Sequence, residues 1–552
     1  MPSNSQQRPP AFLSKQRIIA QTGFNRWLVP PAALAIHLCI GMAYGFSVFW
    51  LPLSKALGIS QSIACVPDIG FFQQLFVHSC DWKVSTLGWM YTLFFVLLGS
   101  SAAIWGGWLE RVGPRKAGLL SAVCWCGGML ISALGIYVHQ FWLMLLGSGV
   151  IGGIGLGLGY ISPVSTLIKW FPDKRGLATG MAIMGFGGGA MIGSPLAVEL
   201  MSYFSTPTSI GAVQTFVVMA LIYFVFMVSG ALAYRIPAQG WMPANWQPQP
   251  KKQQLMTPHH VHASKIWGIP QFWLVWMVLC MNVSAGIGII GMASPMLQEV
   301  FAGQLIGLAD FSFKMLDDVQ LKKVAAIAAG FTALLSLFNI GGRIVWASLS
   351  DKIGRKATYT VFFIFGGLLY ASVPFFANAG EKLYFVAAIC LIVSMYGGGF
   401  ATIPAYLADL FGTQMVGAIH GRLLTAWATA GIIGPVVVNN MRDYQLALGI
   451  PASQVYNQTM FILVGLLFIG LVCNLLIRPV AAKHFMSAEQ LAAEQKLMQE
   501  KQQAETQSLE CNSTQQTMQT TPLLWVVLAW VAVGLPLLWG VYRTLLSMRA
   551  FF

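Results

Sequence analysis

The stretch "FNIGGRIVWASLSDKIGRK", residues 338–356, places a cation inside an apolar segment and indicates the kind of fold. Its second half is a charged loop of the kind found at a membrane surface. Its first half belongs to an apolar run that starts near Val324 and contains Arg343, eight residues before Asp351. At about 1.5 Å of rise per helical residue, Arg343 lies roughly 12 Å inward from that loop. In a hydrocarbon core about 30 Å thick, this depth is close to the midplane.

The composition predicts an all-α polytopic membrane protein. The chain has 552 residues, of which 56% are hydrophobic and 9% are charged, and its mean hydropathy is +0.67. A soluble domain carries roughly 25% charged residues. The net charge of +14 is explained better by basic cytoplasmic loops than by nucleic-acid binding, because no basic run is interleaved with aromatic residues. The polar N-terminus precedes a long apolar segment, so we expect no cleaved signal peptide.

Twelve apolar segments are long enough to cross a membrane as helices, and they form two sets of six separated by a polar loop. A thirteenth apolar segment follows a polar stretch, and we expect it to be an accessory helix on the lipid-facing surface. The expected organisation is a cytoplasmic segment (1–26), a six-helix bundle (27–235), a cytoplasmic loop (236–268), a second six-helix bundle (269–479), a polar cytoplasmic linker (480–521) and a thirteenth transmembrane helix (522–543).

Charge distribution predicts the orientation. Most of the 32 Lys and Arg residues fall in loops that are cytoplasmic when the N-terminus is inside. Arg543 and Arg549 follow the thirteenth span and oppose this assignment, but we expect the twelve preceding spans to outweigh them. We therefore expect a cytoplasmic N-terminus and an external C-terminus. We also expect the protein to be a monomer in the cell inner (plasma) membrane.

The two halves share landmarks at one spacing, which indicates an internal duplication. Such repeats form two bundles related by an axis along the membrane normal, with the binding site between them at mid-depth. The matched pairs, 240 or 241 residues apart, are Glu110 with Asp351, Pro163 with Pro404, Gly176 with Gly417, and Pro195 with Pro435.

Two loop sequences, "GGWLERVGPRKAG" (106–118) and "SLSDKIGRK" (348–356), resemble the paired loop motifs of the major facilitator superfamily. In that superfamily the acid and the arginines tie helix ends together at the cytoplasmic face and release them during transport. This chain has Glu110 where aspartate is usual, and Ala347 where the second copy would begin with glycine. The resemblance implies gating roles for Gly106, Glu110, Arg111, Gly113, Arg115, Asp351, Gly354, Arg355 and Lys356.

Three further stretches are similar to the oxalate:formate antiporter family: "GMAYGFSVFWLPL" (41–53), "GLGYISPVSTLIKWFPDKRGLATG" (157–180) and "IHGRLLTAWATAGIIGP" (419–435). The resemblance covers about residues 24–480. That family exchanges small carboxylates between its two bundles by means of cationic and aromatic residues. Its arginine in span eight matches Arg343, whereas its lysine in span eleven falls on Trp427. Because a dicarboxylate such as oxalate would use two cations, this departure favours a substrate with one carboxylate. Oxalate stays open if another group replaces the missing lysine, and Arg422, a few residues into span eleven, is the candidate.

Arg343 has three possible roles. Its planar fork can hold a carboxylate through two parallel hydrogen bonds. It can instead be structural, paired with backbone carbonyls or extended toward the loop. A salt bridge to a buried acid is the third possibility, but none of the 18 Asp and Glu residues lies clearly at mid-span; Glu199, Glu299 and Asp409 lie near span ends. Without a mid-span acid as proton carrier, an anion exchanger or a symporter whose substrate brings the proton fits best.

Aromatic residues are the other candidates for the site. They are Tyr44, Tyr160, Tyr396, Phe400 and Trp427, of which Tyr160 and Phe400 are equivalent under the repeat spacing. Aromatic rings can enclose a small planar anion, and a tyrosine hydroxyl can donate a hydrogen bond to it. Ordinary helix packing is the alternative role for each of them.

Several other features have simpler interpretations. Cys65 and Cys80 share an outer loop and would form a disulfide if that face is oxidising. His37, deep in span one, either titrates or is hydrogen-bonded within the bundle. The glycine strings at 152–159 and 185–193 favour close helix packing over dinucleotide binding, because they lie inside apolar spans. The histidines of "TPHHVHASK" (257–265) are interpreted as incidental, so we expect no metal site and no cofactor.

The sequence thus predicts a secondary active transporter of small carboxylates that works by alternating access. The substrate would be a monocarboxylate such as formate, pyruvate or lactate, or oxalate and formate in exchange, with or without a co-transported or exchanged ion. We expect no enzymatic activity, because no His-Glu-x-x-His pair, phosphate-binding loop or paired intramembrane carboxylates are present. A transporter-like receptor that signals through residues 480–521, or a carrier of another class of anion, stays open as an alternative.

Overall fold

The computed structural model describes residues 13–549, apart from 22, 60, 66–68, 172, 174, 239–240, 244–258, 310, 413–414, 494–495 and 497–520. The side chains of residues 16, 107, 110, 168, 175–179, 182 and 548 also lie outside the description. Glu110 is among them, so its predicted gating role is outside what the structure describes. The same holds for most of the predicted linkers at 236–268 and 480–521.

Helices make up nearly all of the described structure. In chain order the α-helices are α1 (Val29–Ile40), α2 (Trp50–Leu53), α3 (Phe71–Gln74), α4 (Val84–Val112), α5 (Pro114–Tyr137), α6 (Phe141–Met144), α7 (Gly153–Trp170), α8 (Arg175–Phe204), α9 (Ala212–Ala233), α10 (Pro270–Phe301), α11 (Asp318–Ile353), α12 (Arg355–Asn378), α13 (Lys382–Phe411), α14 (Val416–Leu423), α15 (Thr425–Ala447), α16 (Asn457–Leu476) and α18 (Leu523–Met548).

These helices supply 13 segments that are long and apolar enough to cross a membrane, as the sequence predicts. Span one joins α1 and α2 through the 3-10 helix η3 (Gly41–Phe49), and span four joins α6 and α7 through the π-helical segment η4 (Leu145–Gly152). Span eleven consists of α14 and α15. The all-α fold of twelve spans with an additional C-terminal helix is therefore confirmed.

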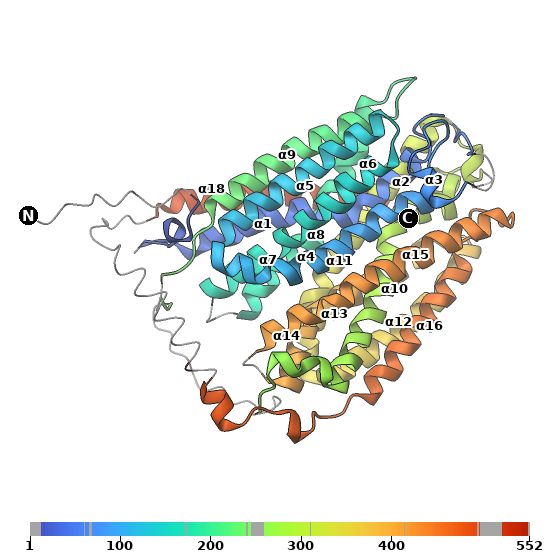
Figure 1. The fold of residues 1–552 in the computed structure, drawn as a ribbon. Helices are drawn as coiled ribbons and strands as arrows, with labels where there is room; N and C mark the ends of the chain where they lie inside the picture. The colour runs from blue at the N-terminus through green and yellow to red at the C-terminus, as the bar shows by residue number, and fades with distance from the viewer. Residues whose placement is uncertain are drawn as a thin grey trace, which may run out of the picture.

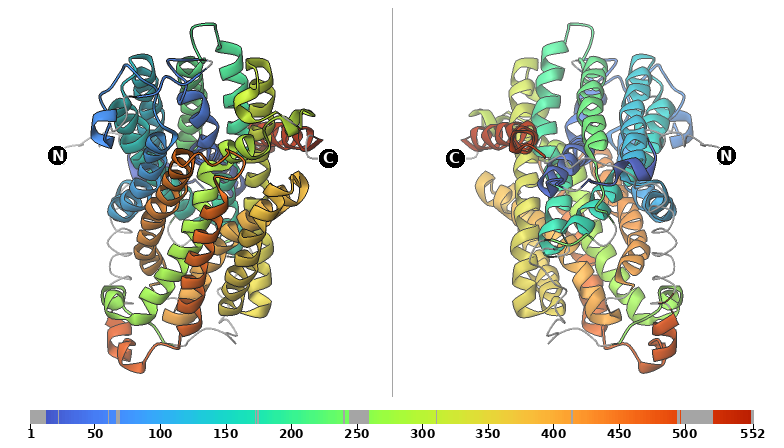
Figure 2. Two further views of the ribbon diagram at one scale, coloured as in Figure 1. Left: turned by 90° about the vertical axis from the view of Figure 1, so that its right-hand side faces the viewer. Right: turned by 90° about the vertical axis from the view of Figure 1, so that its left-hand side faces the viewer.

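The spans form two groups that face each other. Figure 1 shows α5, α7 and α9 on one side of the molecule and α12, α14 and α16 on the other, and Figure 2 shows the same helices from two further directions. The matched prolines lie inside equivalent helices, Pro163 in α7 with Pro404 in α13, and Pro195 in α8 with Pro435 in α15. The repeated spacing in the sequence thus corresponds to equivalent helices in the two halves.

The loop motifs repeat in backbone geometry as well. Gly113 ends α4 with a φ of 89°, and Gly354 ends α11 with a φ of 89°. A φ in this range is one that glycine adopts at low steric cost, which explains why both copies of the motif contain glycine here. The chain then reverses directly into α5 and α12.

The basic residue two positions after each of these glycines makes an equivalent contact. In the first half, Arg115 donates to the backbone oxygens of Leu232 (3.0 Å) and Tyr234 (3.4 Å) at the end of α9. In the second half, Lys356 donates to the oxygens of Leu475 and Ile477 at the end of α16, both at 2.8 Å. Carbonyls at a helix C-terminus lack partners within the helix and carry partial negative charge, so a cation stabilises them. Each motif therefore ties the third helix of its half to the sixth.

Glycines permit close contact between helices, as the glycine strings predict. A Cβ added to Gly189 in α8 would lie 2.3 Å from the carbonyl carbon of Gly41 in span one. A Cβ added to Gly155 in α7 would lie 2.6 Å from the backbone nitrogen of Trp125 in α5. Both glycine strings lie within helices of the first half, where they bring backbones together.

Helix α18 packs against both halves, and it lies at one edge of the molecule in Figure 2. Trp530 Nε1 donates to the backbone oxygen of Trp27 at 3.1 Å, and Arg543 pairs with Glu199 near the end of α8. A Cβ added to Gly330 of α11 would lie 2.1 Å from the Cβ of Ser547, so α18 also touches the second half closely. The thirteenth span is thus a docked accessory helix with contacts to α1, α8 and α11.

Candidate functional site

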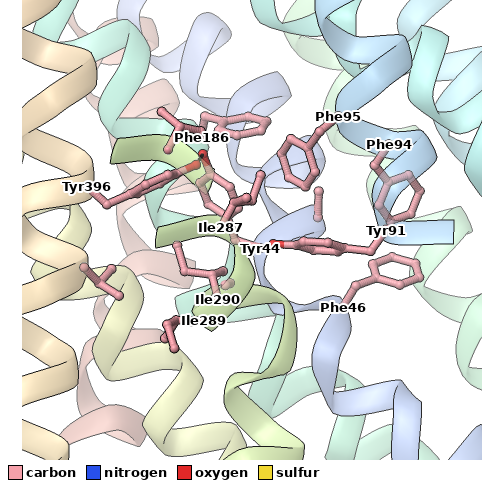
Figure 3. Packing of buried hydrophobic residues seen from close by; sticks show 14 of the residues in the cluster. Tyr44, Phe46, Tyr91, Phe94, Phe95, Phe186, Ile287, Ile289, Ile290 and Tyr396 are labelled. Carbon is pink, nitrogen blue, oxygen red and sulfur yellow. Dashed lines mark hydrogen bonds between the residues drawn. The ribbon is translucent and has the colours of Figure 1, made fainter. Parts of the chain in front are cut away.

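The predicted aromatic residues meet at the junction of the two halves. The hydroxyls of Tyr44 in span one and Tyr396 in α13 are hydrogen-bonded to each other at 2.8 Å, and their ring centroids are 6.0 Å apart. Phe186 of α8 packs edge-on against Tyr44 at 4.9 Å, and Phe95 of α4 stacks on Tyr44 at 5.8 Å. Figure 3 shows these four side chains between the helices. The hydrogen bond and ring contact between Tyr44 and Tyr396 therefore join the two halves, while Phe186 and Phe95 pack around Tyr44 within the first half.

Trp427 of α15 belongs to the same cluster. Its ring lies 4.5 Å from Phe400 and 5.3 Å from Tyr160, measured between ring centroids. Tyr160 and Phe400, the pair equivalent under the repeat spacing, therefore contact one indole from opposite halves. Phe95 and Phe186 complete its surroundings at 5.9 and 6.0 Å. Trp427 Nε1 is buried and has no hydrogen-bond partner in the described structure.

Arg343 lies at the edge of this cluster and is 5% exposed. Its Nε donates to Asn339 Oδ1 at 3.1 Å, one helical turn earlier in α11. Its guanidinium carbon is 5.8 Å from the centroid of the Phe400 ring. Its Nη1 is buried and has no hydrogen-bond partner among the described atoms. A guanidinium always carries its charge, so a buried, unpaired N–H of this group favours an anionic partner.

A glycine of the first half lies close to Arg343. A Cβ added to Gly187 of α8 would lie 3.4 Å from Arg343 Nε and 3.5 Å from Asn339 Oδ1. Ser336, on the same helix as Arg343, hydrogen-bonds to the backbone oxygen of Gly187. A cavity of about 10 Å³ lies beside Tyr44, Ser336 and Asn339. The space beside Tyr44, Ser336 and Asn339 is thus nearly filled in this arrangement of the helices.

The structure brings all six predicted substrate-binding residues into one connected cluster: Arg343, Tyr44, Tyr160, Tyr396, Phe400 and Trp427. Sequence reasoning missed Phe186, Phe95 and Asn339. Phe186 lies in the glycine string 185–193, which was interpreted as packing alone, and its place between glycines was the available signal. Asn339 lies four residues before Arg343 and therefore on the same helix face.

His37 has the simpler of its two predicted roles. It is fully buried, its Nε2 lies 3.1 Å from the backbone oxygen of Tyr160, and its ring stacks on that of Tyr160 with centroids 5.7 Å apart. His37 thus packs against Tyr160 and is hydrogen-bonded within the first bundle.

A buried ion pair near the end of α10 was not predicted. Arg442 Nε donates to Glu299 Oε2 at 2.9 Å, and the Tyr456 hydroxyl donates to the same oxygen at 2.6 Å. Arg442 also contacts Asp443 at 2.9 Å, and Asp443 accepts a hydrogen bond from Ser85 of the first half. Helix α15 continues to Ala447, so Arg442 and Asp443 both lie near its end, and Arg442 is buried there.

The loop and disulfide residues lie as follows. Arg355 pairs with Asp351, and its Nε is 3.8 Å from Asp409 at the end of α13, so the second motif also reaches the fourth helix of its half. In the first motif Arg111 is exposed.

Cys65 and Cys80 are joined by a disulfide that closes a loop beyond span one. The described residues hold no group of three or more His, Cys, Asp or Glu side chains that could bind a metal.

Comparison with known proteins agrees with this architecture. The family model of the Major Facilitator Superfamily matches residues 69–435, which is more than half of the chain. The chain belongs to the major facilitator superfamily. Like its relatives, it is a membrane transporter and not an enzyme.

Individual relatives are more distant. The oxalate:formate antiporter of Oxalobacter formigenes is 25% identical over 411 residues, covering 74% of this chain and 83% of that protein. The apicoplast pyruvate carrier 1 of Toxoplasma gondii is 23% identical over 448 residues, covering 70% and 78%. A crystal structure of a D-xylose-proton symporter superposes with a TM-score of 0.58 at 14% identity, covering 82% of this chain and 96% of that one. The last comparison supports the fold alone.

Proposed function

We propose that this chain transports small carboxylates by alternating access, with the carboxylate held by Arg343 between the two halves. The substrate class is a monocarboxylate such as formate, pyruvate or lactate, or oxalate and formate in exchange. The observation that carries the proposal is the unpaired Nη1 of Arg343, buried beside Phe400 where the halves meet. The names of the two carboxylate-transporting relatives support the same class of substrate.

The chemistry of the cluster suits a single carboxylate. Arg343 Nε is already bonded to Asn339, so a carboxylate would bind through the remaining guanidinium N–H groups. Tyr44 and Tyr396 bond to each other, and either hydroxyl could turn to donate to an anion instead. Trp427, where the resembling family has lysine, offers an indole N–H and no charge. Among the described contacts of these aromatic side chains, the cation is Arg343, which favours one carboxylate over two.

The contacts between the two halves support the alternating-access part of the proposal. Contacts between the halves run through α4 with α15 and α8 with α11, so rotation of one half against the other would open these surfaces. Trp50 Nε1 bonds to the backbone oxygen of Gly291 at 2.7 Å, and Ser47 Oγ accepts from Ser294 N at 3.4 Å. These contacts lie toward the end that we place outside, and they would separate when the site opens there.

We further propose that the chain lies in the cell inner membrane, with its N-terminus in the cytoplasm, its C-terminus outside, and its domain boundaries as set out from the sequence. The described ends of the chain are consistent with one another. Asn25 N donates to Thr521 Oγ1 at 3.1 Å, so span one and α18 begin at the same face.

Two substitutions test the role of Arg343. In purified full-length protein, Arg343→Gln should weaken binding of the transported carboxylate by about 10- to 100-fold, because a charged hydrogen bond contributes about 1.5–3 kcal/mol. Arg343→Lys should recover little of it, because the charge stays but the fork is lost. Arg478→Gln, an exposed arginine beyond α16, is the matched control. Normal transport by folded Arg343→Gln would show that the arginine is structural. Saturable binding without transport in the wild type would point to a receptor.

A further inference from the structure

A second cavity lies far from Arg343. It is between the two halves, at the end of the molecule where α11 begins. Its volume is about 590 Å³. The first half contributes Lys55, from the turn after α2, and Ser205, after the end of α8. The second half contributes Phe313 and Lys322. Lys322 precedes Arg343 by 21 residues on the same helix, which places it roughly 30 Å away along the helix axis.

Two lysines from opposite halves give this cavity its charge. Lys322 Nζ donates to Ser205 Oγ at 2.9 Å and so connects the halves. Lys55 is partly buried, and its Nζ lies 5.7 Å from the centroid of the Phe313 ring. Asp318 also lines the cavity, and its charge interacts with Lys55. Burial lowers the pKa of Lys55 while Asp318 raises it. The described lining residues include two cations and one anion, which gives this part of the wall an excess of one positive charge.

The remaining wall is largely apolar. Val48, Leu51, Ile210 and Leu321 are among its lining residues. Small-molecule sites typically occupy about 300–1,000 Å³ and combine an apolar lining with a few polar groups that orient the ligand. The volume is several times what formate or pyruvate would fill, so the cavity is not matched to the substrates proposed for Arg343.

We propose that this cavity binds an amphipathic organic anion, with a carboxylate held between Lys55 and Lys322 and an apolar body against the surrounding side chains. Excess positive charge favours an anion over a neutral or cationic molecule of the same shape. Since the wall comes from both halves, the occupant would hold their ends together. Its binding would slow transport without competing for Arg343.

The experiment uses full-length protein in nanodiscs, with 2-naphthoate as the probe and the uncharged 2-naphthamide as its isostere. Saturable binding of 2-naphthoate should weaken about 5- to 10-fold in Lys55→Gln and in Lys322→Gln, since each removes one charge-assisted contact that is partly screened by solvent. Lys323→Gln, an exposed neighbour on α11 that does not line the cavity, should bind as the wild type does. The amide should bind more weakly than the acid.

Arg343→Gln separates this site from the transport site. That variant should bind 2-naphthoate normally even where it no longer binds the transported carboxylate. Equal binding of acid and amide, unchanged binding in a folded Lys322→Gln variant, or loss of binding in Arg343→Gln would each overturn the proposal. Because Lys322 is exposed, its substitution keeps the test decisive even if Lys55→Gln does not fold.

Discussion

Replacing Gly342 with alanine should force α11 away from α13, whereas the same change at the neighbouring Gly341 should be tolerated. A Cβ at Gly342 would lie 2.0 Å from the backbone oxygen of Ser394 and 2.6 Å from its carbonyl carbon. At Gly341 an added Cβ would meet nothing within 4 Å. The clash at Gly342 is with backbone, which cannot rotate aside as a side chain can, so the whole helix would have to move.

The two substitutions share one favourable contribution and differ in the clash. Glycine is about 1 kcal/mol less favourable than alanine inside a helix, and this gain applies at both positions. Overpacking typically costs about 1–3 kcal/mol, and a backbone clash belongs at the upper end of that range. We therefore expect Gly341→Ala to be neutral or slightly stabilising, and Gly342→Ala to be destabilising by about 2 kcal/mol.

Thermal unfolding of both variants in the same detergent measures this difference, with transport in proteoliposomes as a second readout. Gly342→Ala should unfold at a lower temperature than Gly341→Ala. It should also transport poorly, because the shift would displace Arg343, the next residue along α11. Equal unfolding temperatures for the two variants would refute the close contact between α11 and α13 on which the position of Arg343 depends.

Three further predictions concern other parts of the molecule. Neutralising either partner of the buried Glu299–Arg442 pair should cost about 3 kcal/mol, and the double variant should cost less than the sum; additive unfolding costs would contradict the pairing. Burial lowers the pKa of His139, so the unfolded chain takes up a proton more readily than the folded protein, and the folded protein loses stability as the pH falls below about 6.5. His139→Gln should therefore reduce the loss of stability between pH 7 and 5, and an unchanged pH profile would refute this role of His139. Trp427→Lys should raise uptake of oxalate relative to formate, because it would add a second cation to the site. An unchanged uptake ratio in folded protein would count against residue 427 as the position that sets this preference.

Much of the fold could be predicted because lipid imposes simple rules. Long apolar segments must form helices there, so hydropathy alone located all 13 spans. The duplication was visible because special residues, prolines within helices and glycines at reversals, are hard to replace. Gly113 and Gly354 have the same φ, and the basic residue two positions after each contacts the end of the sixth helix of its own half. Arg343 was recognisable because a charge deep in an apolar segment is costly and therefore rare.

The rest depended on packing, which the sequence pattern does not reveal. The pair of Arg442 with Glu299 was not predicted because its partners lie on α15 and α10, which are far apart in the sequence and meet only in the folded protein. Phe186 looked like part of a packing string until the structure placed it between Tyr44 and Trp427. The cavity beside Lys55 and Lys322 brings together residues that are distant in the sequence, and the local sequence around each lysine does not mark it as part of a site.

Counterflow in proteoliposomes tests the central claim most directly. Vesicles containing the full-length protein are preloaded in turn with formate, oxalate, pyruvate, lactate or acetate, and uptake of the labelled form of the same acid is compared with uptake by unloaded vesicles. We predict that preloading stimulates uptake of at least one monocarboxylate, and that Arg343→Gln abolishes the stimulation while Arg478→Gln preserves it. No stimulation by any of the five acids, from protein shown to be folded, would contradict the assignment of small carboxylates to this site.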